Sequence, residues 1–582
     1  MINRVIKKIK GILSKQQLSR VAILSVLMVI GGFLETISIS LMMPFISSVM
    51  NPDEIMVKWY AKIVINIFGI EDSRAFLVLL AVILAAIYIG KNVYLLFEYN
   101  IQFRFVYNNM LIMQRRLLAS FVRKPYEYYL KINSGDIIRI INNDTPNAFT
   151  LLLTLLNLLT EIIVSGMIIL SIFIIVPGVT TCIALVLGLL LLAIGYIIKP
   201  QLRKAGITMQ SSSAGMNKWL IQSIHGIKEL KVMRREKYFE ESFDVHGRQY
   251  VNSLRKSKML EMMPRFFIEA FSMSTLFVAV AVMIFAGNDL ASIIPILSAV
   301  AMAALRLLPS VNRISNSVAN IALYEPMLDK LIEVIDDNDA VLNKTDIKEQ
   351  EYHKFRINQV HRDIVLNNIS FRYPDTDVDV LAETGLTIKK GESIGIVGSS
   401  GAGKSTTVDV LLGLLTPQKG SILVDGVDIV DDLQGWYKQI GYIPQTIFML
   451  DDTIRNNICF GIEDKDISDQ GIWKVLKDTA LVDFVKSLPN GLETEIGERG
   501  VRLSGGQRQR IGIARALYNK PAVLIFDEAT SALDNDTEAE IMESIKQLQN
   551  KKTMVIIAHR LTTIQDCDHI YRVEQGKITK ER

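Results

Sequence analysis

Long apolar stretches alternate with charged segments through roughly the first half of the chain. Two of them, Val21–Met50 and Phe149–Val176, each contain a single charged residue, Glu35 and Glu161 respectively. Both exceed the roughly 20 apolar residues that a helix needs to cross a bilayer. Four further stretches have the same character and bring the predicted membrane spans to six: Ala75–Phe97, Pro177–Ile198, Phe266–Gly287 and Ala291–Val311.

The segments between the predicted spans differ in length. The third and fourth spans meet at a corner formed by Pro177 and Gly178, and the fifth and sixth meet at a short turn around Gly287–Asp289. By contrast, residues 101–145 and 199–265 form long, polar connections that permit helix. They predict spans that continue as helices well beyond the membrane.

The distribution of charge predicts the orientation in the membrane. The first 20 residues carry six basic residues and no acid, whereas the segment after the first span carries Asp53, Glu54, Glu71 and Asp72 beside two lysines. Because basic flanks stay in the cytoplasm, we expect a cytoplasmic N-terminus and, after six crossings, a cytoplasmic C-terminal part. A secretory signal peptide is not expected, since the first apolar stretch is too long for one and no small-residue cleavage site follows it.

Net charge and cysteine content give no indication of a nucleic-acid partner, a metal site or a disulfide framework. The net charge of +4 is small, and attraction of cytoplasmic loops to anionic lipid headgroups accounts for it without a nucleic-acid partner. Cys182, Cys459 and Cys567 have neither CxxC nor metal-ligand spacing. A disulfide framework is therefore not expected.

A phosphate-binding loop follows a short apolar run in the last third of the chain. Ile394–Val397 leads into Gly-Ser-Ser-Gly-Ala-Gly-Lys-Ser-Thr, which predicts a strand, a loop and a helix that begins at Lys404. Glycines let backbone N–H groups face the phosphates, and the helix N-terminus adds a favourable dipole. Lys404 is expected to hold the β- and γ-phosphates of ATP, and Ser405 to ligate Mg²⁺. The predicted nucleotide-binding residues are Gly398, Ser399, Ser400, Gly401, Ala402, Gly403, Lys404, Ser405 and Thr406.

Two adjacent carboxylates end a second apolar run, Val523–Glu528. Side chains alternate along a strand, so Asp527 and Glu528 point in different directions. Asp527 can then join the Mg²⁺ shell while Glu528 meets the attacking water. The sequence predicts Glu528 as the general base of ATP hydrolysis.

A third motif, Leu503–Gln507 with the sequence LSGGQ, lies about 100 residues after the phosphate loop. With this order of motifs the chain resembles the ATP-binding cassette (ABC) transporter family. In that family the LSGGQ motif of one cassette closes over ATP held by another. The resemblance therefore implies a homodimer in which Ser504, Gly505, Gly506 and Gln507 bind ATP of the partner chain.

The same resemblance implies roles for residues outside the three motifs. Tyr373 matches the aromatic residue that stacks on adenine, and Gln445 matches the residue that contacts Mg²⁺ and water. Ser531–Asp534 matches the loop after the base, and His559 matches the residue that contacts the γ-phosphate. The implied catalytic set is Glu528, His559 and Gln445, and the implied metal ligands are Ser405, Gln445 and Asp527.

Two segments resemble exporters rather than importers. Thr494–Gly500 is similar to a loop of exporter-type cassettes, and Ser134–Asp144 is similar to their first coupling region. The expected fold class is multidomain: a six-helix transmembrane exporter-type domain followed by an α/β P-loop ATP-binding cassette, together a half-transporter. We expect the membrane domain at 1–325, a charged linker at 326–362 and the nucleotide-binding domain at 363–582.

The cargo is suggested by the membrane half. Leu34–Pro52 and Arg306–Ser317 resemble PglK-type flippases of bacterial N-glycosylation. This likeness implies a multi-pass protein of the bacterial inner membrane that moves polyprenyl-pyrophosphate-linked oligosaccharide outward. The external segment of residues 53–70 has apolar residues at helical spacing with charged residues between them. An amphipathic helix at the outer interface is expected there, as a contact for the polyprenyl tail, a cap packed on the bundle or a passive anchor.

Four cations in or beside the spans are candidates for binding an anionic headgroup: Lys91, Arg265, Arg306 and Arg313. Lys91 and Arg306 each lie about 15 residues from the outer end of their spans, on the order of 23 Å of helix. Basic residues near span ends also reach commonly toward lipid phosphates, so this assignment stays open. The alternatives for function are a drug or lipid A exporter and an ATP-gated channel or sensor.

Overall fold

The computed structural model describes residues 2–41, 72–175, 177–285, 309–337, 355–374, 376–528, 551–558 and 564–582, together with residues 45, 49, 543, 546 and 549. The chain divides into two compact units. The helical unit comprises 1–124 and 131–345, and the α/β unit comprises 125–130 and 346–582. The predicted external segment 53–70, the loop 531–534, Arg306 and His559 lie outside the described residues.

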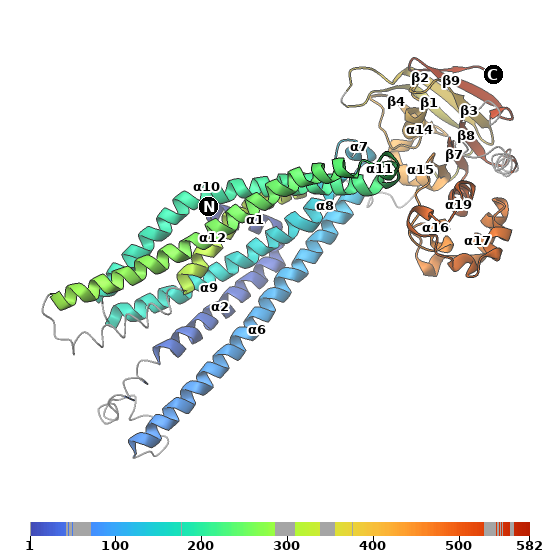
Figure 1. The fold of residues 1–582 in the computed structure, drawn as a ribbon. Helices are drawn as coiled ribbons and strands as arrows, with labels where there is room; N and C mark the ends of the chain where they lie inside the picture. The colour runs from blue at the N-terminus through green and yellow to red at the C-terminus, as the bar shows by residue number, and fades with distance from the viewer. Residues whose placement is uncertain are drawn as a thin grey trace. The chain divides into compact units, whose positions relative to one another are not determined.

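The helical unit consists of long helices that pack side by side (Figure 1). Three of its described segments are long and apolar enough to cross a membrane: Lys15–Ser38, Arg74–Val122 and Ser134–Met167. The predicted fourth span falls within α10, and the predicted fifth, Phe266–Gly287, overlaps α12 as far as Phe285. Most of the predicted sixth span, Ala291–Val311, lies outside the described residues. The helices are α1 (Ile2–Ile12), α2 (Lys15–Ser40), α6 (Ser73–Val122), α8 (Ser134–Arg139), a π-helix (Ile140–Asp144), α9 (Thr145–Ile175), α10 (Pro177–His225), α11 (Ile227–Met233), α12 (Glu236–Phe285) and residues 309–337.

Three of these helices are much longer than a bilayer requires. α6 and α12 have 50 residues each and α10 has 49, so each extends roughly 75 Å at 1.5 Å per residue. The hydrocarbon core is only about 30 Å thick. The expected continuation of helices beyond the membrane is therefore present, and apolar residues such as Leu202 and Leu260 pack α10 and α12 against each other there.

Two features of the helical unit differ from the expectations. The basic N-terminal segment forms a separate helix, α1, whose Val5 and Ile9 are buried. The predicted linker begins as helix, since residues 326–337 continue the helix from 309. Leu328 and Leu331 in it are fully buried, because their spacing places them on one apolar face. The predicted domain boundaries at 325 and 362 stay a prediction.

The α/β unit contains two sheets. The four-stranded antiparallel sheet has the order β2-β1-β4-β5, and the six-stranded, mostly parallel sheet has the order β10-β9-β3-β8-β7-β6. The strands are β1 (Asp363–Phe371), β2 (Leu381–Lys389), β3 (Ser393–Val397), β4 (Lys419–Val424), β5 (Val427–Asp428), β6 (Ile440–Ile443), β7 (Val523–Asp527), β8 (Thr553–Ile557), β9 (His569–Glu574) and β10 (Lys577–Lys580).

The parallel sheet places both predicted catalytic segments at one edge. β3 and β8 are buried along their whole length, which explains why their sequences are continuously apolar rather than alternating. β3 and β7 flank β8 and run parallel to it, so their carboxyl ends lie on the same side of the sheet.

The α-helices among the described residues of this unit are α7 (Tyr126–Tyr129), α14 (Lys404–Leu411), α15 (Leu433–Gln439), α16 (Ile454–Ile458), α17 (Asp469–Asp478), α18 (Val482–Ser487) and α19 (Gly505–Tyr518).

The segment that joins the α/β unit from the first half of the chain is Pro125–Leu130. Glu127 in it accepts a hydrogen bond from the backbone N–H of Thr416 at 2.8 Å. The predicted coupling region, Ser134–Asp144, belongs instead to the helical unit. There Arg139 donates to Asp144 at 2.6 Å, and the coupling role of the segment stays a prediction.

Candidate functional site

The phosphate loop begins where β3 ends and closes at the first turn of α14. Its last glycine, Gly403, is the N-cap of α14 and has φ of +104°. A Cβ at this position would also lie 3.1 Å from the carbonyl oxygen of Val380. Both the conformation and the space require glycine here, and the helix begins at Lys404 as predicted.

Lys404 is buried within its own loop, with a side chain that reaches back toward the end of β3. Its ammonium donates to the carbonyl oxygens of Gly398 and Ser399, at 3.0 Å each. An ammonium has three donors, so these bonds hold the side chain across the loop. This places the positive charge where the motif predicts the β- and γ-phosphates.

Tyr373 lies beside the start of α14. Its hydroxyl is 3.2 Å from Oγ1 of Thr406, and its ring packs edge-to-face on Phe371 with centroids 5.1 Å apart. The structure therefore brings the predicted adenine-stacking residue next to the phosphate loop. Its role in nucleotide binding stays a prediction.

Glu528 follows β7 in an unusual backbone conformation, with φ of +50°. Its backbone N–H donates to the carbonyl oxygen of Ile557 at the end of β8, at 3.2 Å. Gln445, after β6, donates from its amide to the Glu528 carboxylate at 2.7 Å. A left-handed conformation at a glutamate is costly and is found preferentially at functional sites, and here it turns the carboxylate toward Gln445.

Three carboxyl groups crowd the end of β7. Burial, followed by the nearby charge of Glu528, raises the pKa of Asp527. Burial and the charge of Asp527 raise the pKa of Asp409, on α14, to about 6. Tyr442 donates to Asp527 at 3.4 Å, and burial together with this carboxylate raises the pKa of its phenol. Negative charge accumulates at this point, and Lys404 offsets part of it by lowering the pKa of Asp527.

This charge predicts a pH-dependent stability. The raised pKa of Asp409 means that the folded chain binds its proton more tightly than the unfolded chain does, so stability falls as pH rises through about 6. We expect Asp409→Asn to raise the free energy of unfolding above that pH, on the order of 1 kcal/mol because Asp409 is only partly buried and solvent screens the repulsion. Below the ordinary pKa of aspartate the gain should vanish.

Thermal unfolding of the full-length protein at pH 5 and pH 8, without nucleotide, measures this difference. Exposed Asp483 supplies the matched control, since Asp483→Asn removes the same charge far from Asp527 in sequence. Equal melting temperatures for Asp409→Asn and wild type at pH 8 would contradict the predicted repulsion.

The residues present fit a magnesium ion that is bound together with nucleotide. No group of three or more His, Cys, Asp or Glu side chains in a metal-binding arrangement occurs among the described residues. Mg²⁺ commonly takes one or two carboxylates and completes its shell with substrate phosphates and water. Asp527, Ser405 and Gln445 carry oxygen atoms of that kind, and their role as magnesium ligands stays a prediction.

The LSGGQ segment opens α19. Ser504 is the N-cap, its hydroxyl accepts from the backbone N–H of Gln507 at 3.2 Å, and Gln507 accepts in return from the backbone N–H of Ser504 at 2.8 Å. This capping box fixes the first turn. Ser504 and Gly505 are exposed, whereas Gly506 is buried, so the front of the motif remains accessible for a second chain.

The predicted headgroup cations have different environments. Lys91 is 7% exposed, and its ammonium lies 4.8 Å from the ring centroid of Tyr88. Arg313 forms an ion pair with Glu161 and also donates to Ser310 at 3.4 Å. Arg265 is exposed on α12. The structure therefore does not leave all these charges open to a ligand, since Arg313 has an internal counter-ion.

Sequence reasoning did not identify two contributors to these sites. In the sequence Glu161 is a single charge in an apolar span, and its partner Arg313 lies 152 residues further along the chain. The Pro125–Leu130 segment lies within the long predicted connection 101–145. The sequence signal for it is the cluster of Tyr126, Tyr128 and Tyr129 in the predicted connection 101–145.

The comparisons with known proteins agree with this architecture. The model of the ABC transporter transmembrane region matches residues 37–302, and the ABC transporter model matches residues 381–531. A bacterial Atm1-family ABC exporter solved with ATP bound has the same fold, with a TM-score of 0.74 and 22% identity, over 97% of this chain and 95% of that one. The predicted fold class and the exporter-type membrane domain are confirmed.

Several relatives carry the name ATP-dependent lipid A-core flippase, and two of them differ in how much of the chain they match. The one from Methylobacillus flagellatus is 40% identical, but the alignment covers only 38% of each chain. The one from Saccharophagus degradans is 30% identical over 479 residues, which is 80% of this chain and 78% of that one. Since this second alignment includes both the helical unit and the α/β unit, the chain belongs to the ABC transporter family.

Proposed function

We propose that the protein is an ATP-driven exporter of the flippase type. The observation that carries the ATPase part is the 2.7 Å hydrogen bond between Gln445 and the carboxylate of Glu528, directly after the strand that ends in Asp527. It supports a site for an attacking water at the end of β7, close to the phosphate loop after β3. Membership of the ABC transporter family supports the same reaction.

Each residue has a distinct task in this proposal. Glu528 accepts a proton from the water that attacks the γ-phosphate, and Gln445 holds the carboxylate in position. Lys404 exchanges its two carbonyl partners for phosphate oxygens. Mg²⁺, held by Ser405, Asp527 and Gln445, would reduce the negative charge on the phosphates. His559, the proposed γ-phosphate contact, is carried over from the family resemblance alone.

The second half of each site is proposed to come from a second copy of the chain. Ser504 and Gly505 are exposed at the capped start of α19, which supports a contact with the ATP of the partner. ATP binding would then draw two α/β units together, and hydrolysis would release them. We place the protein in the bacterial inner membrane with the N-terminus and the cassettes in the cytoplasm.

For the cargo we propose a polyprenyl-pyrophosphate-linked oligosaccharide, moved outward. The support is the PglK-like character of Leu34–Pro52 and Arg306–Ser317 and the buried charge of Lys91. A buried cation in a membrane span is costly and is commonly functional. The relatives named lipid A-core flippases support a lipid cargo in general and keep lipid A as the alternative.

The contact between Arg313 and Glu161 refines the proposed headgroup site. Glu161 is 9% exposed, and its Oε2 has no hydrogen-bond partner among the described residues. Its carboxylate therefore neutralises Arg313 while no cargo is bound. A pyrophosphate would compete with Glu161 for the guanidinium, which binds phosphate oxygens in the same bidentate manner as a carboxylate.

Reconstituted vesicles test the cargo directly. ATP-dependent transfer between leaflets would be measured for a pyrophosphate-linked glycolipid, lipid A and a hydrophobic drug in parallel, together with ion leakage. We expect transfer of the glycolipid and no ATP-dependent leakage. Transfer of the drug alone would overturn the cargo, and leakage without lipid transfer would indicate a channel.

Variants of the ion pair should separate cargo binding from the ATPase. We expect Arg313→Ala to reduce glycolipid transfer at least 10-fold, because a hydrogen bond between charged groups contributes about 1.5–3 kcal/mol. Adding Arg306→Ala should abolish it. Basal ATP hydrolysis should persist in both, whereas Glu161→Gln should bind the glycolipid more tightly than wild type because the competing charge is gone.

The controls test separately whether the position of the arginine and its positive charge matter for transfer. Arg255→Ala removes an exposed arginine of α12 and should leave transfer unchanged, and Arg313→Lys should be milder than Arg313→Gln. If Arg313→Ala transfers glycolipid as wild type does, the arginine only neutralises Glu161. Equal loss of transfer and ATPase would indicate damaged coupling.

A further inference from the structure

α1 presents two different faces to its surroundings. Ile2, Ile6, Ile9 and Leu13 recur at helical spacing and line an apolar cavity, whereas Arg4, Lys7 and Gly11 line a cavity on another face. Residues three or four apart share a helix face. The helix is therefore amphipathic in the manner of helices that lie at a membrane surface.

The first cavity, which we name the apolar groove, has a volume of about 240 Å³. It lies between α1, α2 and α9, and its lining includes Ile6, Ile9, Val21, Leu155, Leu159 and Ile162. The lining residues on α2 run from Leu18 to Ser25 and those on α9 from Leu152 to Ile162, which correspond to roughly 10 and 15 Å of helix. The groove thus extends along the spans, as an acyl chain does.

The lining of this groove includes one lysine. Lys10 lines it at α1, and the remaining lining residues are apolar apart from Ser25. Lys7 lies three residues before Lys10 and is also exposed. Neither lysine, nor Arg4, has an ion pair or hydrogen bond among the described residues. An apolar cavity that one cation lines, with two more on the same helix, matches an amphiphile with an anionic head.

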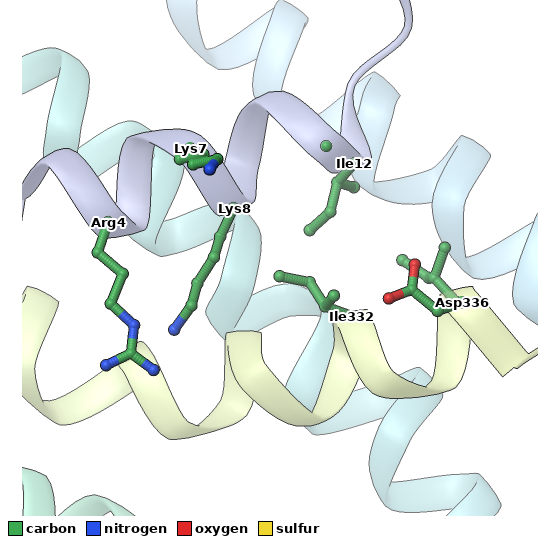
Figure 2. A pocket seen from close by; sticks show the side chains of 8 residues that line it. Arg4, Lys7, Lys8, Ile12, Ile332 and Asp336 are labelled. Carbon is green, nitrogen blue, oxygen red and sulfur yellow. The ribbon is translucent and has the colours of Figure 1, made fainter.

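The second cavity, the basic cavity, has a volume of about 400 Å³ and is lined by Arg4, Lys7 and Lys8 on α1 and by Ile332 and Asp336 opposite. Figure 2 shows Arg4 and Lys8 extending from α1 toward the helix of residues 309–337. Lys8 is paired there with Glu325, at 3.5 Å, and with Asp329. Lys8 therefore anchors α1, while Arg4 and Lys7 keep their charge for a ligand.

We propose that α1 is a binding site for an anionic glycerophospholipid of the adjacent leaflet. One acyl chain occupies the apolar groove, and Lys7 and Lys10 bind the phosphate, with Arg4 adding positive charge nearby. α1 directly precedes the span Lys15–Ser38, so the lysines lie at the depth of lipid headgroups. The ion pairs of Lys8 with Glu325 and Asp329 hold α1, with its bound lipid, against the helix of residues 309–337. The inference does not depend on the proposed cargo.

Native mass spectrometry of the full-length protein tests this site. The protein would be titrated with equimolar phosphatidylglycerol and phosphatidylcholine of identical acyl chains. We expect one phosphatidylglycerol per chain to be retained in preference. Lys7→Gln/Lys10→Gln should reduce that preference roughly five-fold for each lysine removed, and Ile6→Trp, which fills the groove, should reduce binding of both lipids.

Matched variants provide the controls. Lys15→Gln/Lys228→Gln removes two exposed lysines outside both cavities, and Val26→Trp adds the same bulk on the exposed face of α2. Both should bind lipid as wild type does. Equal binding of the two lipids by the wild-type protein would overturn the proposal. So would an equal loss of the preference for phosphatidylglycerol in the Lys7→Gln/Lys10→Gln and Lys15→Gln/Lys228→Gln variants. Displacement of phosphatidylglycerol by millimolar inorganic phosphate would also overturn it, because a free anion would then suffice.

The single variant Lys10→Gln distinguishes a loss of lipid binding from a folding defect in the double variant. It changes one exposed side chain, and thermal unfolding of each variant reports its integrity. An intermediate preference for phosphatidylglycerol in this variant supports the site, and an unchanged preference in a folded Lys10→Gln protein contradicts it.

Discussion

Replacing Glu528 with glutamine is expected to lower ATP turnover by roughly 10²- to 10⁴-fold, which is the contribution typical of a general base. Glutamine is almost the same size, and its carbonyl oxygen can still accept the hydrogen bond that Gln445 donates at 2.7 Å. The variant therefore keeps the geometry and loses only the basic carboxylate. Steady-state phosphate release and single-turnover hydrolysis measure the effect.

Measurement of ATP binding distinguishes a loss of the general base in Glu528→Gln from misfolding of the variant. Lys404 and Asp527 are unchanged, so ATP should bind to Glu528→Gln with wild-type affinity and accumulate in a closed dimer. Exposed Glu574, on β9, is the matched control, because Glu574→Gln makes the same replacement outside the site. Turnover within a few-fold of wild type would remove Glu528 from the role of general base.

A mixture of two inactive variants is expected to regain hydrolysis. In a dimer of Lys404→Ala and Ser504→Arg chains, one composite site carries both changes and the other carries neither. Each parent dimer carries one change in each site and should be inactive. Random pairing makes half of the dimers mixed, so the mixture should reach roughly a quarter of wild-type ATPase if the two sites act independently.

Two affinity tags allow the mixed dimers to be purified and assayed alone. Their activity per dimer should approach half that of wild type, and Lys404→Ala chains with two different tags should stay inactive as the control. Purified mixed dimers that are as inactive as the parents would contradict independent composite sites. That outcome would mean either that Ser504 acts on its own chain or that both sites must hydrolyse together.

The motifs of the proposed nucleotide site can be recognised in the sequence because each motif is local. The phosphate loop needs its glycines within a few residues of Lys404, and the φ of +104° at Gly403 is the reason. β3 and β8 read as apolar runs because both faces of the parallel sheet are covered. The family resemblance and the fold class followed from the order of these motifs.

The contacts that position the side chain and backbone of Glu528 could not be predicted in this way. Gln445 and Glu528 are 83 residues apart, and only the pairing of β6 with β7 brings them together. Glu528 also has a positive φ, and its N–H donates to Ile557 at the end of β8. A single sequence carries no record of such approaches, since they arise from the packing of the whole sheet.

The sequence by itself determined that the chain has long apolar spans, a phosphate loop, paired carboxylates and an LSGGQ motif. These are patterns of hydrophobicity and spacing that depend on neighbours along the chain. Only the tertiary structure decided that Arg313 meets Glu161, that Pro125–Leu130 joins the α/β unit, and that α1 closes a groove with α2 and α9. Such contacts join residues that are distant in sequence, and burial of apolar surface in the folded chain, rather than local preference, selects them.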